Sequence, residues 1–243
     1  MTGIYTLLGA LLKLMYNLIG HYGWAIVAFT VAVKLLLMPL MQAQNRSMKA
    51  MTEVQPKIEE LKKKYPNNQE KQNEAMVKLY KDYNVNPLLG CLPMLVQLPI
   101  LIGLFRVLRE PVTFVFKSEA AMKAADTGFY WIKSMASPDV ITIGGLTLPF
   151  ILPLIAAIST YYDSKTMSKG QPQNQMTTTM TYMMPLMILL WGRSFPAGLS
   201  LYWAVSNVFS ILQRKLLNPK VGPDAKDSKV VPTSKDSKGG KRP

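Results

Sequence analysis

The feature that most constrains this chain is a series of long, almost uncharged stretches that alternate with strongly charged ones. A helix needs about 20 mostly apolar residues to cross the hydrocarbon core of a bilayer, within a range of roughly 17–25. The stretches that approach this length are residues 22–41, 88–108, 146–162, 176–191 and 198–217. They predict an all-α, polytopic membrane protein with five transmembrane helices.

The remaining composition narrows the chemistry. Only 17% of the 243 residues are charged, against roughly 25% in a soluble domain. One His and one Cys exclude a multi-His metal site, an intrachain disulfide and a CxxC motif. The chain also lacks the G-x-x-x-x-G-K-S/T, H-E-x-x-H and G-x-S-x-G motifs. We therefore expect no catalytic residues, no cofactor, no metal and no small-molecule substrate.

The distribution of Lys and Arg predicts the orientation. About 20 of the 28 basic residues fall in residues 42–86, in residues 163–175 and after residue 213, and about six fall in the segments on the other side. Because basic loops stay in the cytoplasm, the N-terminus is expected outside and the C-terminus inside a bacterial cell membrane.

The first 21 residues predict a helix of a different kind. Lys13, Asn17 and His21 recur at helical spacing against several leucines, and no positive segment or small-residue cleavage site marks a signal peptide. We expect residues 1–21 to form an amphipathic helix on the outer membrane surface. A sixth span is the alternative, and it would reverse the topology.

The segments between the spans differ in character. Residues 42–86 hold two runs with apolar residues three and four apart, broken at residues 66–68, which predicts a cytoplasmic helical hairpin. A solvated, self-packed hairpin without a partner is the alternative. Residues 109–145 are expected to form an extracytoplasmic loop, residues 163–175 a cytoplasmic loop, and residues 218–243 a disordered basic cytoplasmic tail.

Lys34 is the most unusual residue of the first span, because it is the sole charge deep within it. A charge at such a position costs at least ~2.5–3.5 kcal/mol on insertion scales and normally faces a bundle interior or a wet cavity. The alternative is that its flexible stem snorkels toward the cytoplasm. Since no predicted span contains Asp or Glu, an unpaired cation here would suit an acidic partner.

Other polar residues in the spans fit the same cavity. They are Thr30, one turn before Lys34, Gln97 in the second span, and a stripe in the last span made of Tyr202, Ser206, Ser210 and Gln213. Each alone could be a hydrogen-bonding contact between helices. Together with Lys34 they could line one hydrophilic groove.

Methionine is concentrated in the fourth span, at Met176, Met180, Met183, Met184 and Met187. Met is flexible and is frequent on surfaces that accept varied apolar partners. These residues predict either a hydrophobic slide for many different apolar segments, or ordinary side chains that face lipid or fill the core.

Four short motifs resemble the YidC family of membrane protein insertases. They are residues 33–40 (VKLLLMPL), 55–58 (QPKI), 86–100 (NPLLGCLPMLVQLPI) and 195–207 (FPAGLSLYWAVSN), in the order that the family has them. The resemblance covers roughly residues 5–217. The chain resembles either the short, core-only form, without the large extracytoplasmic domain of some members, or a longer member shortened at its N-terminus.

The resemblance implies five spans around a groove whose positive charge attracts acidic residues of the substrate. Lys34 stands where the family usually has Arg. Lysine keeps the positive charge but lacks the planar guanidinium group that can bind a carboxylate through two hydrogen bonds. Thr30, Gln97 and Trp203 fall at groove or substrate-contact positions of the family.

The implied function is insertion of nascent membrane proteins into the bilayer, alone or with the Sec translocon. The basic tail could contact the ribosome or anionic lipids through its cations, Lys226, Lys229, Lys235, Lys238, Lys241 and Arg242. The alternative is a small transporter or channel, which would predict an internal repeat or an intramembrane acidic ion site.

Overall fold

The computed structural model describes residues 2–83, 92–168 and 175–217. Helices dominate the described residues, and the strands form one two-stranded antiparallel sheet. The elements are α1 (Thr2–Ile19), α2 (Tyr22–Leu36), α3 (Met38–Lys64), α4 (Gln69–Asp82), α5 (Leu92–Arg109), the π-helix η2 (Val112–Phe116), α6 (Glu119–Ala124), β1 (Val140–Ile143), β2 (Leu146–Pro149), α7 (Ile151–Met167), α8 (Gln175–Gly192) and α9 (Ala197–Leu217).

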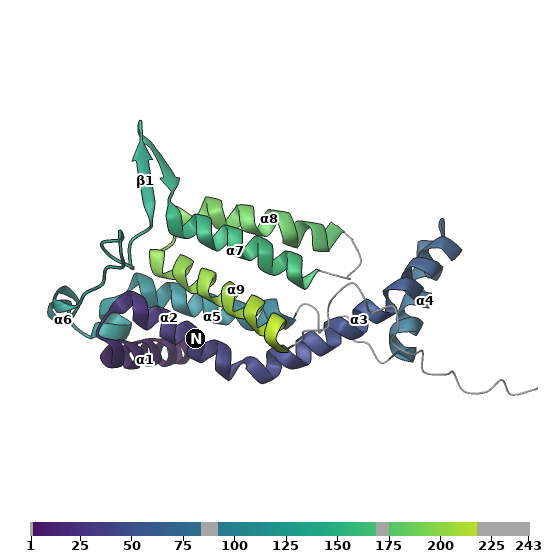
Figure 1. Ribbon diagram of the computed structural model, residues 1–243, viewed down its shortest axis with the longest axis horizontal. Helices are drawn as coiled ribbons and strands as arrows, with labels where there is room; N and C mark the ends of the chain where they lie inside the picture. Colours follow the sequence, from purple (N-terminus) through teal and green to yellow (C-terminus); the bar gives the residue numbers. More distant parts are fainter. Residues whose placement is uncertain (1, 84–91, 169–174, 218–243) are drawn as a thin grey trace, which may run out of the picture.

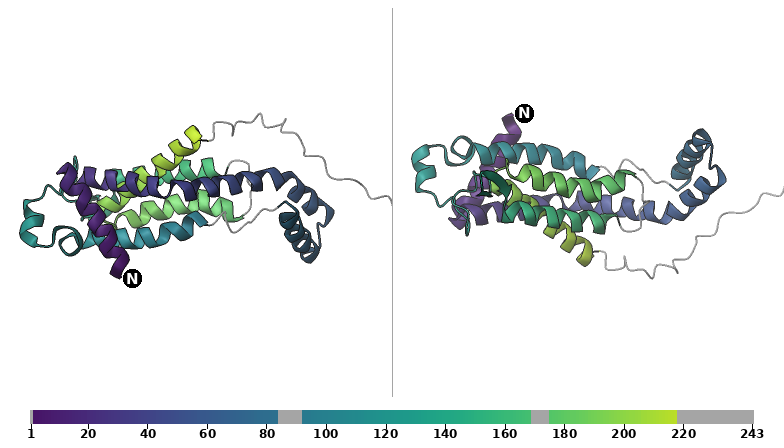
Figure 2. Two further views of the ribbon diagram at one scale, coloured as in Figure 1. Left: turned by 90° about the horizontal axis from the view of Figure 1, so that it is seen from below. Right: turned by 90° about the horizontal axis from the view of Figure 1, so that it is seen from above.

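Five helices, α2, α5, α7, α8 and α9, lie along a common direction and form an elongated bundle (Figure 1). Helix α1 crosses one end of the bundle, where α6 and the β-hairpin also lie (Figures 1 and 2). Helix α3 leaves the opposite end and carries α4 away from the bundle. Judged by length and hydropathy alone, no single helix of the described residues qualifies as a membrane span, whereas the bent pair α2 and α3 qualifies as one.

The predicted first span, residues 22–41, is not one straight helix. Helix α2 ends at Leu36, and α3 continues from Met38 at an angle of 60°. Pro39 lies in the first turn of α3. Because proline has no N–H and its ring clashes with the carbonyl four residues earlier, it is well tolerated at a helix start and kinks or breaks a helix when it lies in the interior.

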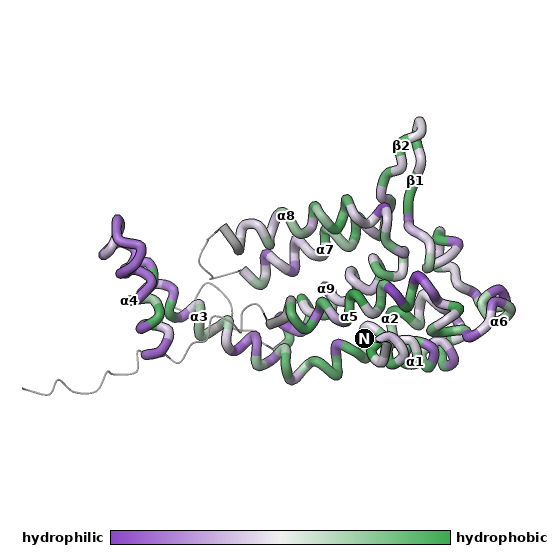
Figure 3. Tube along the Cα trace, turned by 180° about the vertical axis from the view of Figure 1, so that it is seen from behind, coloured by the Kyte–Doolittle hydropathy of each residue, from purple (hydrophilic) through white to green (hydrophobic). Residues whose placement is uncertain are grey.

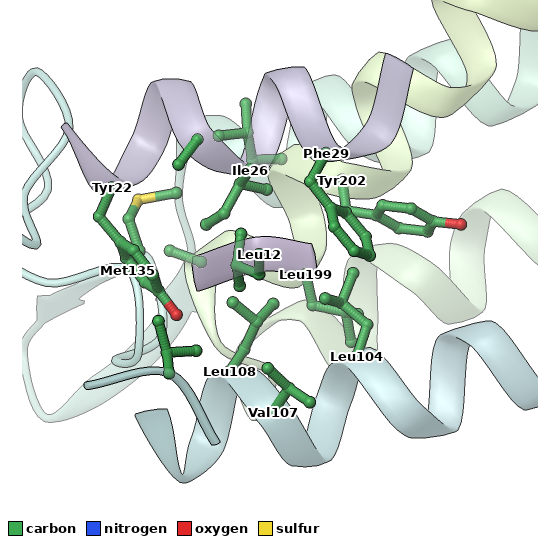
Figure 4. Close-up of a cluster of buried hydrophobic side chains, with 14 of the residues drawn as sticks. Leu12, Tyr22, Ile26, Phe29, Leu104, Val107, Leu108, Met135, Leu199 and Tyr202 are labelled. Carbon is green, nitrogen blue, oxygen red and sulfur yellow. The ribbon is translucent and has the colours of Figure 1, made fainter. Parts of the chain in front are cut away.

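The core lies where α1, α2, α5 and α9 meet. Figure 4 shows its fully or almost fully buried side chains, which come from four helices and one loop: Leu12, Tyr22, Ile26, Phe29, Leu104, Val107, Leu108, Met135, Leu199 and Tyr202. Gly103 permits this packing, because a Cβ there would lie 2.5 Å from a methyl carbon of Leu8 in α1. Helix α1 therefore has a buried face on the bundle and an opposite face with exposed Leu7, Leu14 and Leu18.

The predicted third span, residues 146–162, begins too early. Residues 146–149 form β2 and pair with β1, with Ile143 opposite Leu146, and the helix itself runs from Ile151 to Met167. Gly144 and Gly145 both have positive φ, which lets the chain reverse within two residues. A carboxylate oxygen of Asp139 then accepts a hydrogen bond from the Leu152 N–H at 2.7 Å and satisfies one free donor of the first turn of α7.

Helices α3 and α4 form the hairpin that the apolar spacing of residues 42–86 predicts. The side chain of Asn68 caps α4 by accepting a hydrogen bond from the Lys71 N–H at 3.0 Å. Val54 and Ile58 of α3 are buried against Met76, Leu79 and Tyr80 of α4. Figure 3 shows that α4 is mostly hydrophilic, in contrast to the bundle.

Candidate functional site

A layer of polar side chains joins α2 to α9 within the bundle. Lys34 is 8% exposed, and its Nζ donates a hydrogen bond to Ser210 Oγ at 3.0 Å. Ser210 in turn donates to the backbone carbonyl of Ser206, also at 3.0 Å. Lys34 thus points to the last helix and does not snorkel into solvent.

Thr30 lies one turn before Lys34 and is completely buried. Its hydroxyl donates to the Ile26 carbonyl at 2.7 Å. The hydroxyl hydrogen is thereby used within α2, and only the oxygen lone pairs could receive a donor from elsewhere.

Gln97 and Tyr202 form a second contact, between α5 and α9. Gln97 Nε2 donates to the Tyr202 hydroxyl oxygen at 2.8 Å, and the Tyr202 side chain is 1% exposed. On its other side the Tyr202 ring packs against the Phe29 ring, with 6.5 Å between ring centroids. The structure therefore brings Gln97 and Tyr202 together, as it does Lys34 with Ser210.

Trp203 belongs to a different surface. Together with Met184 it packs against Ala156, Ile188 and Ala204, where α7, α8 and α9 meet. Tyr202 and Trp203 are neighbours in the sequence but lie on different sides of α9, because consecutive residues of a helix point in different directions.

The methionines of α8 are split between its faces. Met183 and Met187 are exposed, whereas Met180 and Met184 are half-buried. Met176 lies in the first turn of α8, but its side chain falls outside the described residues. The six cations that were predicted to contact the ribosome or lipid, from Lys226 to Arg242, are also outside the described residues.

A charged pair that the sequence interpretation missed joins α7 to α9. Asp163 lies one residue beyond the predicted third span, yet it is inside α7, where its carboxylate forms an ion pair with Arg214. Arg214 also donates to Thr166 Oγ1 at 3.1 Å. The polar spacing of Ser159, Thr160, Asp163 and Thr166, at intervals of one, three and three residues, was the signal available in the sequence.

Asn207 adds a neutral contact between the same two helices. Its Nδ2 donates to Ser159 Oγ at 3.1 Å and to Thr160 Oγ1 at 2.8 Å, and all three residues are buried. Buried amides and hydroxyls of this kind hold helices together in an apolar surrounding.

The electrostatic consequence is an asymmetry between the two cations. Arg214 is paired with a carboxylate. Lys34 takes part in none of the ion pairs within the described part of the chain. Lys34 has a neutral hydroxyl as its hydrogen-bond partner. A carboxylate that reached Lys34 would therefore supply a counter-ion that its direct contacts lack.

The described residues contain no cluster of three or more His, Cys, Asp or Glu side chains that could hold a metal ion. The polar layer comprises Thr30, Lys34, Gln97, Tyr202, Ser206 and Ser210, and it therefore offers an ammonium group, an amide, a phenol and hydroxyl groups instead. Such groups donate and accept hydrogen bonds, and the lysine adds a positive charge.

Comparison with known proteins gives a consistent result. The family model described as 60Kd inner membrane protein matches residues 14–223. Membrane protein insertase YidC 2 of Listeria innocua is 39% identical over 82% of this chain and 64% of its own length. Membrane protein insertase YidC of Fusobacterium nucleatum is 34% identical over 90% of this chain and 99% of its own length.

A solved structure supports the same relationship. The crystal structure described as an active YidC insertase with the first transmembrane domain resolved aligns with a TM-score of 0.64 at 30% identity. The alignment covers 87% of this chain and 45% of the other. This chain thus spans less than half of that protein and less than two thirds of the Listeria innocua relative.

Proposed function

The chain belongs to the 60Kd inner membrane protein family, and on that premise we propose that it inserts nascent membrane proteins into the bilayer. The relatives reported above carry the name membrane protein insertase. The transporter alternative has no such support. The single observation that carries the proposal is the buried Lys34, which has a hydroxyl and no carboxylate as its direct partner.

In the proposed arrangement five helices cross the membrane, with α1 on its outer surface and the α3–α4 hairpin in the cytoplasm. The first span runs through α2 and the beginning of α3, and α5, α7, α8 and α9 supply the others. The excess of Lys and Arg in residues 42–86 supports a cytoplasmic hairpin by the positive-inside rule. The exposed Leu7, Leu14 and Leu18 of α1 support its contact with lipid.

The polar layer becomes a groove when a substrate enters it. The hydrophilic tail of a nascent membrane protein replaces the contact between Lys34 and Ser210, and an acidic residue of the tail pairs with Lys34. Gln97, Tyr202 and Ser206 offer further hydrogen-bonding groups along the path. A polar path within the bundle shortens the distance that the tail must travel through hydrocarbon, where each unsatisfied polar group costs several kcal/mol.

The apolar helix of the substrate then leaves sideways into lipid. The exposed methionines of α8, with Trp203 at its junction with α9, offer a surface that adapts to different apolar sequences. Transfer of Leu, Ile, Phe and Val side chains into the membrane is favourable. The insertase therefore lowers a barrier, and the substrate's own partitioning drives the process without any bond chemistry.

Two partners of this process are assigned to charged segments. The α3–α4 hairpin receives the emerging chain. The Lys and Arg side chains of the basic tail bind the phosphate groups of ribosomal RNA, and anionic lipid headgroups compete for the same side chains. Action alone and action with the Sec translocon are both compatible with these roles.

Site-specific photo-crosslinking tests the proposed path. A benzoylphenylalanine in place of Gln97 should crosslink to a ribosome-bound nascent membrane protein. The matched control replaces Leu95, which lies on the same helix, is 60% exposed and points away from the polar layer. Equal crosslinking from both positions would contradict a defined path along the polar layer.

A further inference from the structure

The β1–β2 hairpin carries one apolar face that the rest of the described chain leaves uncovered. Ile141 pairs with Leu148, and Ile143 pairs with Leu146, so the four side chains lie on the same face. Ile143 and Leu146 are 61% and 60% exposed. The opposite face carries Thr142 and Thr147, whose hydroxyl oxygens lie 3.5 Å apart.

The hairpin also lacks the charges that a strand pair in water normally has. Residues 140–162 contain no Asp, Glu, Lys or Arg, so the hairpin and the first three turns of α7 form one uncharged segment. An isolated two-stranded hairpin is marginally stable in water. A free strand edge in water is usually protected by charged residues, which this hairpin does not have.

The direction of the hairpin places it along the membrane surface. It projects sideways from the bundle, across the direction of the helices, at the end where α7 begins and α8 ends (Figures 1 and 3). Viewed from above it is seen nearly end-on (Figure 2). If α7 and α8 cross the bilayer as proposed, a hairpin in this orientation lies parallel to the outer membrane surface.

Two exposed tryptophans lie in segments next to the hairpin. Trp191 is exposed near the end of α8, and Trp131 is exposed in the loop before β1, where its Nε1 donates to Asp139 Oδ1 at 3.2 Å. Tryptophan is enriched where the hydrocarbon meets the headgroups. Leu154 and Ile155, in the first turns of α7, are exposed as well, so the hairpin precedes a helix surface that faces lipid in the proposed arrangement.

We propose that the β1–β2 hairpin is a membrane-surface anchor whose Ile141, Ile143, Leu146 and Leu148 side chains lie in the outer leaflet at the boundary between headgroups and acyl chains. Its depth is limited, because the unpaired N–H and C=O groups of both strand edges need water and cannot enter the hydrocarbon. This inference rests on α7 and α8 spanning the membrane, and it does not depend on insertase activity.

Lipid-quenching fluorescence tests the proposal with a control on the same strands. The single Cys91 is replaced by Ser, and one new cysteine is placed in the full chain at Ile143 or Leu146, or at Thr142 or Thr147 as the matched control. Each variant is labelled with an environment-sensitive dye and reconstituted alone into vesicles of phosphatidylcholine and phosphatidylglycerol. Nitroxide-labelled lipid, with the nitroxide on the upper part of the acyl chain, should quench the dye at residues 143 and 146 more than at residues 142 and 147.

The contrary outcomes are equally specific. Equal quenching at all four positions, or stronger quenching at residues 142 and 147, would overturn the proposal. If the dye at residues 143 and 146 is shielded from water in native membranes, but not in vesicles of the purified protein, the face would be assigned to a protein partner instead. Shielding that disappears when the protein is diluted with lipid would assign it to a second copy of the chain.

Discussion

Removal of the Lys34 charge should slow insertion of substrates with acidic tails and leave neutral tails largely unaffected. Lys34 is 8% exposed, so salt and water screen its charge less than they would at a surface. Two unit charges 4 Å apart interact by about 4 kcal/mol at an effective dielectric constant of 20. Most of that is offset by desolvation of the incoming carboxylate.

The net effect is best estimated from hydrogen bonds to charged groups, which contribute about 1.5–3 kcal/mol. Loss of that amount at the barrier corresponds to a decrease of roughly ten- to a hundred-fold in the insertion rate. Lys34→Met is the most informative variant, because it keeps an apolar stem of similar length and removes the ammonium group, with its charge and its hydrogen bond to Ser210. Lys34→Ala should show the same loss, and Lys34→Arg should retain most of the rate because it keeps the charge.

The assay measures insertion of a single-span substrate into proteoliposomes and compares an acidic tail with a tail in which Asn and Gln replace its Asp and Glu. Ser210→Ala is the matched control, since it removes the hydrogen-bond partner of Lys34 but leaves the charge. The reasoning is refuted if Lys34→Met inserts the acidic substrate at the wild-type rate. An equal loss for acidic and neutral tails would also refute it, since the defect would then be structural.

Three further predictions concern other parts of the chain. Asp163→Asn should lower the free energy of unfolding in detergent by roughly 3 kcal/mol, because it leaves Arg214, which is about four-fifths buried, without its counter-ion. Adding Arg214→Gln should restore part of this loss. Strict additivity of the two substitutions would show that the pair is not coupled. Ile58→Ala should destabilise the α3–α4 hairpin by about 2 kcal/mol or more, since Ile58 is 2% exposed; protease cleavage within the hairpin should accelerate, and an unchanged rate would count against the packing described. Deletion of residues 219–243 should weaken ribosome binding in a salt-dependent manner, and unchanged co-sedimentation would exclude that role.

The sequence was most informative about helices and their breaks. The apolar spacing of residues 42–86 located both helices of the hairpin, because three- and four-residue spacing reports directly on which side of a helix is buried. Pro39 was visible in the sequence, but the 60° bend that it accompanies depends on how α2 and α3 pack around it.

The β-hairpin was missed because a continuous apolar run does not separate a strand from the start of a helix. The signal was nevertheless present. Gly144-Gly145 lies between two four-residue segments in which apolar residues alternate with Thr, which is a typical pattern of a two-residue hairpin turn.

The contacts of the polar layer were only partly accessible from the sequence. Helical spacing grouped Ser206 with Ser210, but the hydrogen bond of Ser210 with Lys34 joins residues 176 positions apart. The pairing of Asp163 with Arg214 was missed because the predicted span ended at residue 162, before the helix does. Pairings between distant helices follow from packing, which local spacing does not specify.

Reconstitution of the purified chain into liposomes, with insertion of a small single-span substrate followed by protease protection, tests the central claim most directly. An autonomous insertase should protect the substrate in proportion to the amount of protein in the vesicles, with no other protein present. If the protein gives no stimulation either alone or when supplied with the Sec translocon, and instead conducts ions in the same vesicles, the insertase account is contradicted and the channel alternative takes its place.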